Sequence, residues 1–317
     1  MKANERIAVV LFQLGGPDSL EAIEPFLYNL FRDPDIINFP GAFLARRPLA
    51  KFISSRRSKK VVAHYKEIGG KSPIVDLTNA QAIALQRELD KQMNAKVFVA
   101  MRYWHPMVDE VARAVRAYAP ERVVLLPLYP QYSTTTTESF LRVWQSARVD
   151  IPTATIRDYP DEPGFIAALA RLTRAGIVQA EQHGTPRVLF SAHGLPKKIA
   201  AQDPYQSHVE RTVAAVLRAL GPAVADHVIC YQSRVGPLEW IKPYTEDEIR
   251  RAGSDKVPVV LVPVAFVSEH SETLVELDMD YRELAARAGV PVYVRVPTVG
   301  TAPEFIAGLA RLVQGVG

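Results

Sequence analysis

The chain has 317 residues, of which 48% are hydrophobic and 23% charged, with 24 prolines and one cysteine. This composition excludes a disordered chain, a collagen-like fibre and a disulfide-rich scaffold, and the length suffices for two lobes with separate cores. Lysine and arginine exceed aspartate and glutamate by four, and a net charge of +4 means little unless it is concentrated in one place.

The amino terminus predicts a strand rather than a targeting segment. The apolar run Ile7–Phe12 is too short for the hydrophobic region of a signal peptide and no cleavage-site pattern follows it. No apolar stretch approaches the roughly 18 residues that suggest a membrane span. Cys230 is the only cysteine, so an intramolecular disulfide, a zinc site of Cys/His spacing and an iron–sulfur cluster are not expected. We expect a cytoplasmic protein, attached to the inner face of the membrane at most peripherally.

Short apolar, β-branched runs alternate with longer amphipathic runs along the chain. Strands are predicted at residues 6–14, 96–101, 122–127, 153–157, 186–192, 227–232, 257–264 and 291–296. This alternation predicts βαβ units, and hence parallel sheets with helices on both faces. Local signals predict an N-cap at Asp18, a first-turn position at Pro106, and a helix that begins near Asp203 and ends at Gly221-Pro222.

Two pairs of similar segments indicate an internal duplication. Val10–Gly16 resembles Val188–Gly194, and Val124–Leu128 resembles Val260–Val264. The two segments lie about 42 residues further apart in the first half of the chain than in the second. An insertion of this length is longer than ordinary loops. We therefore expect two similar α/β lobes, the first carrying an insertion at about residues 32–73.

The positive charge is concentrated in that insertion. Ile36–Lys66 contains eight lysines and arginines and no acidic residue, so it carries +8 while the rest of the chain is net −4. Its apolar neighbours, among them Phe39, Phe43 and Phe52, make it an apolar and basic lip rather than a nucleic-acid-binding stripe. The alternatives are a solvated basic helix or a surface that collects an apolar anion, at an anionic membrane.

The ends of the strands are where doubly wound lobes bind ligands, in a cleft. His193 follows the fifth strand and precedes Gly194 and Pro196, which stop regular structure. Imidazole in this place can act as a base or bind a metal, and the alternative is a hydrogen-bonded structural histidine.

A row of carboxylates follows the seventh strand. Ser268 is the predicted N-cap of a helix in which Glu272, Glu276 and Asp280 fall at i, i+4 and i+8. Like charges at this spacing repel one another on one helix face. The row therefore indicates a path along which cations or protons move, and the alternative is a solvated helix face. Histidine and carboxylates together suit a hard or borderline divalent metal.

Two aromatic and basic segments also follow strands. Met101–Pro106 and Tyr231–Trp240 place aromatic rings beside arginine, a combination that could receive a flat, anionic, conjugated ligand. The chain has no G-x-G-x-x-G and no P-loop lysine, so no nucleotide is expected. The loop Gly15–Asp18 offers at most a weak anion site, and Ser133–Thr137 is explained by turn and cap chemistry.

Several motifs in order make the chain resemble the ferrochelatases, the enzymes that insert ferrous iron into a porphyrin to make haem. The motifs cover nearly the whole sequence: Leu14–Pro17, Ile68–Pro73, Arg102-Tyr103, Ser191–Pro196, Gln232–Pro237 and Ser268–Leu274. The resemblance implies a chelatase-like α/β fold of two similar Rossmann-like lobes with parallel sheets around a central cleft. It divides the chain into an N-terminal lobe (1–156), a C-terminal lobe (157–300) and a C-terminal helix (301–317) that packs back on the first lobe.

The resemblance also implies roles for individual residues. His193 and Glu272 match the facing histidine and carboxylate that handle Fe²⁺ and protons, His270 accompanies Glu272, and Glu276 and Asp280 match a metal or proton path. Further positions match contacts to the porphyrin: Arg57, Tyr65, Ser72, Arg102, Tyr103, Tyr132 and Trp240. Glu269 departs from the pattern, because many relatives carry aspartate there. Iron is implied as a substrate, with no permanently bound cofactor and no iron–sulfur cluster.

The expected reaction is Fe²⁺ insertion into protoporphyrin IX with release of two protons, the last step of haem synthesis. His193 could accept protons or deliver the metal, and the residues leave this open. Alternatives within the class are a coproporphyrin III ferrochelatase or a cobaltochelatase acting on a sirohydrochlorin. A non-catalytic haem or porphyrin carrier has no use for the acidic row, and a nucleotide-sugar transferase is disfavoured by the motifs.

Overall fold

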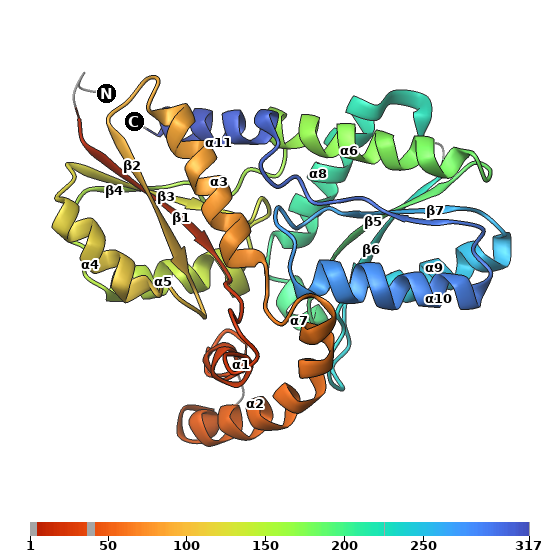
Figure 1. Ribbon diagram of the computed structural model, residues 1–317, viewed down its shortest axis with the longest axis horizontal. Helices are drawn as coiled ribbons and strands as arrows, with labels where there is room; N and C mark the ends of the chain where they lie inside the picture. Colours follow the sequence, from red (N-terminus) through yellow and green to blue (C-terminus); the bar gives the residue numbers. More distant parts are fainter. Residues whose placement is uncertain (1–4, 37–41, 225, 317) are drawn as a thin grey trace. The chain divides into compact units, whose positions relative to one another are not determined.

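Two four-stranded parallel sheets organise the computed structural model, which describes residues 5–36, 42–224 and 226–316 (Figure 1). The strand order is β2-β1-β3-β4 in one sheet and β6-β5-β7-β8 in the other. The chain divides into two compact units, Met1–Arg157 with Leu309–Gly317 and Asp158–Gly308. In each sheet the first strand along the chain lies between the second and the third, and the fourth lies next to the third. The predicted α/β fold with two similar Rossmann-like lobes is therefore confirmed.

The first unit has a fully buried strand, β1, inside its sheet. Its strands are β1 (Ile7–Gln13), β2 (Ala95–Met101), β3 (Arg122–Pro127) and β4 (Thr153–Thr155). Its helices are α1 (Ile23–Phe31), α2 (Ala42–Glu67), α3 (Ile74–Leu89), α4 (Val108–Tyr118), the π-helix η1 (Thr134–Glu138) and α5 (Ser139–Ser146). All seven residues of β1 are buried, and β2 and β3 pair with it along both edges. A continuous apolar run is what such a strand requires.

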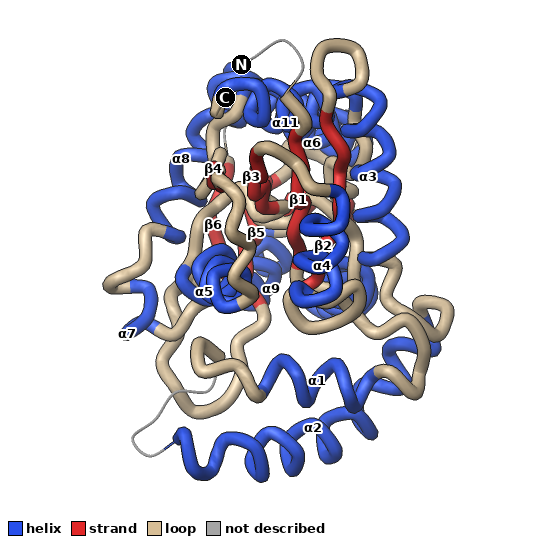
Figure 2. Tube along the Cα trace, turned by 90° about the vertical axis from the view of Figure 1, so that its left-hand side faces the viewer, coloured by secondary structure: helices blue, strands red, loops and turns tan. Residues whose placement is uncertain are grey.

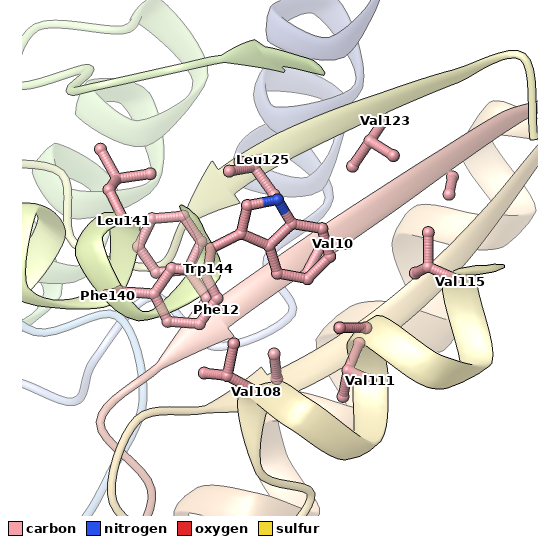
Figure 3. Close-up of a cluster of buried hydrophobic side chains, with 13 residues drawn as sticks. Val10, Phe12, Val108, Val111, Val115, Val123, Leu125, Phe140, Leu141 and Trp144 are labelled. Atoms are coloured by element: carbon pink, nitrogen blue, oxygen red, sulfur yellow. The ribbon is translucent and has the colours of Figure 1, made fainter. Parts of the chain in front are cut away.

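The core on one face of this sheet is closed by α4 and α5 (Figure 3). Alternate residues of β1, including Val10 and Phe12, point to this face, as the two-residue period of a strand requires. Phe12 stacks on Phe140 with ring centroids 3.9 Å apart, and Trp144 of α5 completes the cluster. Near its carboxyl end, β1 therefore packs directly on α5.

The second unit repeats this plan. Its strands are β5 (Arg187–His193), β6 (His227–Gln232), β7 (Val259–Pro263) and β8 (Tyr293–Arg295). Its helical elements are α6 (Pro163–Glu181), α7 (Lys197–Ala200), α8 (Tyr205–Leu220), the 3₁₀-helix η2 (Gly221–Ala223), α9 (Thr245–Asp255), the π-helix η3 (Glu272–Asp280) and α10 (Tyr281–Ala288). Figure 1 shows α6 and α8 on one side of the sheet and α9 and α10 on the other. A Cβ on Gly176 of α6 would lie 2.9 Å from Val296 Cγ2, so glycine permits the close helix–sheet packing.

The last helix, α11 (Pro303–Gly315), is shared between the two compact units, which divide between Gly308 and Leu309. In the second unit, Glu304 pairs with Arg171 at 2.7 Å. In the first unit, Gln314 Nε2 donates to Gln92 Oε1 at 3.1 Å.

The eight predicted strands all occur within two residues of their predicted bounds, whereas three helix boundaries were wrong. Helix α1 begins at Ile23, after a turn, rather than at Asp18, and Met107 rather than Pro106 is adjacent to the first residue of α4. Residues Ser268 to Ser271 precede η3, so Ser268 does not cap it directly. The helix that ends at Gly221 begins at Tyr205, whose N–H bonds to Asp203 Oδ1, as predicted.

The basic segment forms a long helix. α2 runs beside α1, beyond the carboxyl ends of the strands of the first unit (Figure 2). Its side chains Ala50 and Tyr65 are buried against α1, while Phe52 remains 64% exposed. Phe39 and Phe43, which were part of the predicted lip, lie outside the residues whose side chains are described.

Candidate functional site

His193 stands at the carboxyl end of a buried strand. It is the last residue of β5, and its Nδ1 lies 2.7 Å from the carbonyl oxygen of Gly194. The N–H of Gly194 in turn donates to the carbonyl oxygen of Gln232, at the end of the neighbouring strand β6. Because a carbonyl oxygen can only accept a hydrogen bond, Nδ1 carries the hydrogen, and this contact favours the tautomer in which Nε2 is the unprotonated nitrogen. The imidazole is one third exposed, so Nε2 is available for chemistry.

Glu272 lies between two imidazoles. Its Oε1 is 3.8 Å from His193 Nε2, and its Oε2 is 3.8 Å from His270 Nε2. Both distances are longer than a hydrogen bond. The structure therefore brings together the three residues that the sequence predicted as the catalytic group.

His270 is held more tightly than His193. Its side chain is 8% exposed, its Nδ1 lies 3.2 Å from the carbonyl oxygen of Ser268, and its ring is 4.6 Å from that of Phe266. The N–H of His270 donates to Thr273 Oγ1, which closes the turn leading into η3. His270 is thus a fixed neighbour of Glu272 rather than a mobile surface histidine.

Glu276 is the most constrained carboxylate of the acidic row. Ser233 donates to it twice, from its backbone N–H at 2.8 Å and from its hydroxyl at 2.5 Å, and Tyr281 donates its hydroxyl at 3.1 Å. Burial and then the charge of Glu272 raise the pKa of Glu276 above its usual value, while the bonds from Ser233 and the nearby His193 act in the opposite direction. A carboxylate with a raised pKa binds a proton more readily than an ordinary carboxylate, which suits a proton acceptor.

The predicted helix that carries the row is a π-helix rather than an α-helix. η3 spans Glu272–Asp280, and π-helical segments occur frequently at functional sites. With about 4.4 residues per turn, a spacing of four still keeps Glu272, Glu276 and Asp280 near one face. Sequence periodicity could not distinguish the two helix types. Asp280 is exposed and Glu276 half-buried, so the row runs outward from the imidazoles.

Trp240 packs beside His193. The two ring centroids are 6.3 Å apart, and Trp240 Nε1 donates to the carbonyl oxygen of Val235 at 3.0 Å. A Cβ on Gly194 would lie 3.2 Å from the indole, so glycine allows this approach. Trp240 is 7% exposed, so nearly all of its surface is buried.

In the first unit, two of the predicted porphyrin contacts lie on the basic helix α2 and a third, Ser72, follows it. Arg57 of α2 lies 5.7 Å from the centre of the Phe31 ring, and Tyr65 is buried in the same cluster. Ser72 is also buried, and its N–H donates to the carbonyl oxygen of Pro17 at 2.8 Å. A Cβ on Gly16 would lie 2.6 Å from Ser72 Oγ, which explains the glycine in that motif.

Arg102 and Tyr103 are joined to a buried carboxylate that the sequence did not indicate. Asp33 Oδ2 accepts from Arg102 Nη2 at 2.6 Å, from the Tyr103 hydroxyl at 2.6 Å and from Ser139 Oγ at 2.7 Å. Burial alone would raise the pKa of Asp33, but Arg102 and these donors lower it overall. Tyr103 is 1% exposed, so its position is explained by this network; a porphyrin contact for it stays a prediction.

Tyr132 has a polar environment of its own. Its hydroxyl donates to Glu138 Oε2 at 2.8 Å, and Arg157 Nη2 donates to the same hydroxyl and carboxylate. The Arg157 guanidinium lies 4.9 Å from the centre of the Tyr132 ring. Tyr132 therefore belongs to a half-exposed ion-pair cluster after β3.

Sequence reasoning missed Asp33, Ser233 and Tyr281 as partners of site residues. Asp33 lay in the segment interpreted as an insertion, and Ser233 lay inside a quoted motif without an assigned role. The described residues contain no group of three or more His, Cys, Asp or Glu side chains arranged to hold a metal ion. Cys230 is buried in β6, and burial raises the pKa of its thiol to about 12, so it is not poised as a thiolate ligand. No helix within the described ranges is long and apolar enough to cross a membrane.

Structural comparison places the fold among chelatases. CbiX, described as the terminal enzyme for biosynthesis of siroheme in denitrifying bacteria, matches with a TM-score of 0.53 at 16% identity, covering 98% of this chain and 99% of its own. SirB from Bacillus subtilis matches with a TM-score of 0.55 at 11% identity, covering 98% and 95% of the two chains. At these identities the likeness shows the fold alone.

Sequence comparison is more specific. A ferrochelatase from Caulobacter vibrioides is 54% identical over 315 residues, which cover 98% of this chain and 90% of the relative. A ferrochelatase from Phenylobacterium zucineum is 51% identical over 315 residues, covering 98% and 91%. The ferrochelatase family model matches residues 6–316. The chain belongs to the ferrochelatase family.

Proposed function

We propose that this chain inserts Fe²⁺ into protoporphyrin IX, with release of two protons, to form protohaem. The observation that carries the proposal is the cluster in which Glu272 lies 3.8 Å from both His193 and His270, at the carboxyl end of a central strand. Metallation needs a group that accepts pyrrole protons and anionic oxygens that replace water around the cation. A histidine, a carboxylate and a second histidine supply both.

The spacing of these groups suits a cation in transit. A separation of 3.8 Å between Nε2 of His193 and Oε1 of Glu272 is too long for a hydrogen bond but leaves room for a metal bonded to each at about 2.1 Å. Glu276 and Asp280 continue the negative charge along η3. We propose that this row conducts protons or Fe²⁺, with His193 either accepting a pyrrole proton or delivering the metal.

The porphyrin is proposed to contact residues that follow strands, together with residues of α2 and of the turn before α3. Trp240 would lie beside it in the second unit. In the first unit the proposed contacts are Arg57, Tyr65, Ser72, Arg102, Tyr103 and Tyr132. Arginines at these positions suit propionate groups, and aromatic walls suit the flat ring. A site that bends the macrocycle would expose its nitrogen lone pairs and so lower the barrier to metal entry.

The helix α2 is proposed to collect the porphyrin at an anionic membrane surface. Glu67, its last residue, is its single acidic residue; the helix carries Arg46, Arg47, Arg56 and Arg57 and exposes Phe52. Each basic residue near an anionic surface contributes about 1 kcal/mol of attraction. Replacing the four arginines by glutamine should weaken binding to vesicles that contain anionic lipid by at least tenfold, measured by co-sedimentation. Unchanged binding of both vesicles and porphyrin would contradict this role.

The deciding experiment is a metal-by-porphyrin activity matrix. Fe²⁺, Co²⁺ and Zn²⁺ are each assayed with protoporphyrin IX, coproporphyrin III and sirohydrochlorin. The proposal expects Fe²⁺ with protoporphyrin IX to give the highest kcat/KM. A preference for coproporphyrin III or for Co²⁺ with sirohydrochlorin would select those chelatase activities instead, and tight porphyrin binding with no metallation would indicate a carrier.

A further inference from the structure

One arginine of the neighbouring strand reaches both ends of the site segment His270–Glu276. Arg295 is the last residue of β8. Its Nη1 donates to Glu269 Oε1 at 2.6 Å, and its Nη2 lies 3.4 Å from Asp278 Oδ2. Glu269 directly precedes the site segment and Asp278 follows it by two residues in η3. The guanidinium therefore links Glu269, just before the segment, to Asp278, just after it.

The ion pair at the first end is largely removed from solvent. The side chain of Arg295 is 10% exposed and that of Glu269 is 19% exposed. The same Glu269 oxygen also accepts the backbone N–H of Thr298 at 3.0 Å, just beyond β8. Within the described ranges, Glu269 Oε2 and Arg295 Nε have no hydrogen-bonding partner. A buried ion pair with incompletely satisfied atoms is poorly suited to maximise stability, which favours a role in fixing geometry.

The second end is attached to the same strand by independent contacts. Arg282 donates from Nε to Asp278 Oδ1 at 3.1 Å and from Nη1 to the carbonyl oxygen of Tyr293 at 3.0 Å. The Tyr293 hydroxyl donates to the carbonyl oxygen of Leu277 at 2.5 Å. The end of η3 thus has several anchors, and at the start of the segment the Glu269 carboxylate adds a side-chain tie to β8 to the backbone bond from Gly300 to Val267.

We propose that Arg295 is a positioning residue that sets the geometry of His270 and Glu272 for metal insertion. The inference rests on the proposed function and goes beyond it, because Arg295 touches none of the reacting groups. The planar guanidinium can address two carboxylates at once, whereas a lysine ammonium is a point charge on a flexible stem. Arg295→Lys therefore keeps the positive charge and removes the planar guanidinium that reaches both carboxylates.

An inner strand of the same sheet supplies a control at its amino end. Arg187, the first residue of β5, is 8% exposed and pairs with Asp226 at 2.8 Å and with Asp255 at 2.9 Å. It is as buried as Arg295 and also bridges two carboxylates, but it lies at the amino end of its strand, away from the site segment. Arg187→Lys therefore measures how the loss of a buried guanidinium with two carboxylate partners affects stability, separately from the site.

Two readouts test the proposal in the full-length protein. The first is amide hydrogen exchange of residues 270–280, followed by mass spectrometry, which does not depend on activity. Arg295→Lys should accelerate exchange there at least tenfold, and Arg187→Lys should leave it within twofold of wild type. The second is the steady-state rate with Fe²⁺ and protoporphyrin IX, for which Arg295→Lys should lower kcat at least tenfold.

The KM for porphyrin should stay within twofold in Arg295→Lys, because the change reaches the metal-handling groups rather than the ring-binding surface. If Arg295→Lys does not fold, Glu269→Gln removes the charge at the first end and should give the same results. Wild-type exchange and kcat in the folded variant would overturn the proposal, as would an equal loss of kcat in Arg187→Lys. A wild-type protein that fails to insert iron would refute the proposed function instead, and the exchange comparison would still decide whether Arg295 holds the segment.

Discussion

Replacing Ser233 by alanine removes one of the donors that hold the Glu276 carboxylate and leaves the backbone nearly unchanged. Ser233 has a φ of 63°, a left-handed conformation in which serine and alanine are strained alike. Its backbone N–H bond to Glu276 survives the substitution, while the hydroxyl bond is lost. Because that hydroxyl bond lowers the pKa of Glu276, its loss raises a pKa that burial and Glu272 have already raised.

The size of the effect follows from the difference between charged and neutral hydrogen bonds. A bond to an ionised group contributes about 1.5–3 kcal/mol and a neutral one about 0.5–1.5 kcal/mol, a difference of about 1 kcal/mol. Since about 1.36 kcal/mol corresponds to one pH unit and Ser233 is partly exposed, the loss of the bond should displace a pH profile that depends on ionised Glu276 by about 0.5–1 pH unit, toward higher pH because the pKa of Glu276 rises.

The pH dependence of iron insertion measures this shift. If ionised Glu276 takes up protons from the reaction, the acid limb of the kcat profile of Ser233→Ala moves to higher pH by about 0.5–1 unit. Tyr281→Phe removes a second hydroxyl donor and should move the limb in the same direction. Ser207→Ala, on the exposed side of α8, should leave the profile unchanged.

Denaturant unfolding provides an independent check of the sign. A carboxyl whose pKa is raised by folding destabilises the native state above its folded pKa, and this contribution disappears below the unfolded pKa of about 4.3. The loss of stability in Ser233→Ala should therefore be about 1 kcal/mol larger at pH 8 than near pH 4. An acid limb that stays within 0.2 units of wild type, with a pH-independent loss of stability, would refute the reasoning.

His193→Ala should lower the rate of iron insertion by at least about 100-fold while porphyrin still binds, measured by fluorescence quenching; wild-type turnover would end its assignment. Asp33→Asn should lower the free energy of unfolding by about 3–5 kcal/mol, because it leaves the half-buried Arg102 without its ionised partner; a loss below about 1 kcal/mol in denaturant unfolding would contradict that network. Gly176→Ala should destabilise by about 1–3 kcal/mol through overpacking against β7 and β8, whereas Gly315→Ala meets open space and should not destabilise; equal unfolding midpoints for the two variants would show that the sheet yields instead.

The strands could be predicted from the sequence because each is a short apolar run bounded by residues that stop regular structure. Val9, Val10 and Leu11 in β1, and Val260, Leu261 and Val262 in β7, are all buried, which requires a continuous run rather than alternation. Helix starts were less predictable, since a single residue such as Asp18 can bond within a turn as readily as cap a helix. The left-handed stop at Gly221 was found because glycine adopts that conformation without strain.

The sequence by itself determined the fold class, the family and the residue types that gather at the strand ends, because these depend on local patterns that survive without knowledge of contacts. Only the tertiary structure decided how those residues are held. Asp33 meets Arg102 across 69 positions of the chain, and Arg295 meets Glu269 across 26. Such pairs carry no local periodicity, since burial and charge complementarity select them only once the strands are in register. For the same reason, the π-helical form of η3 could not be read from the spacing of its carboxylates.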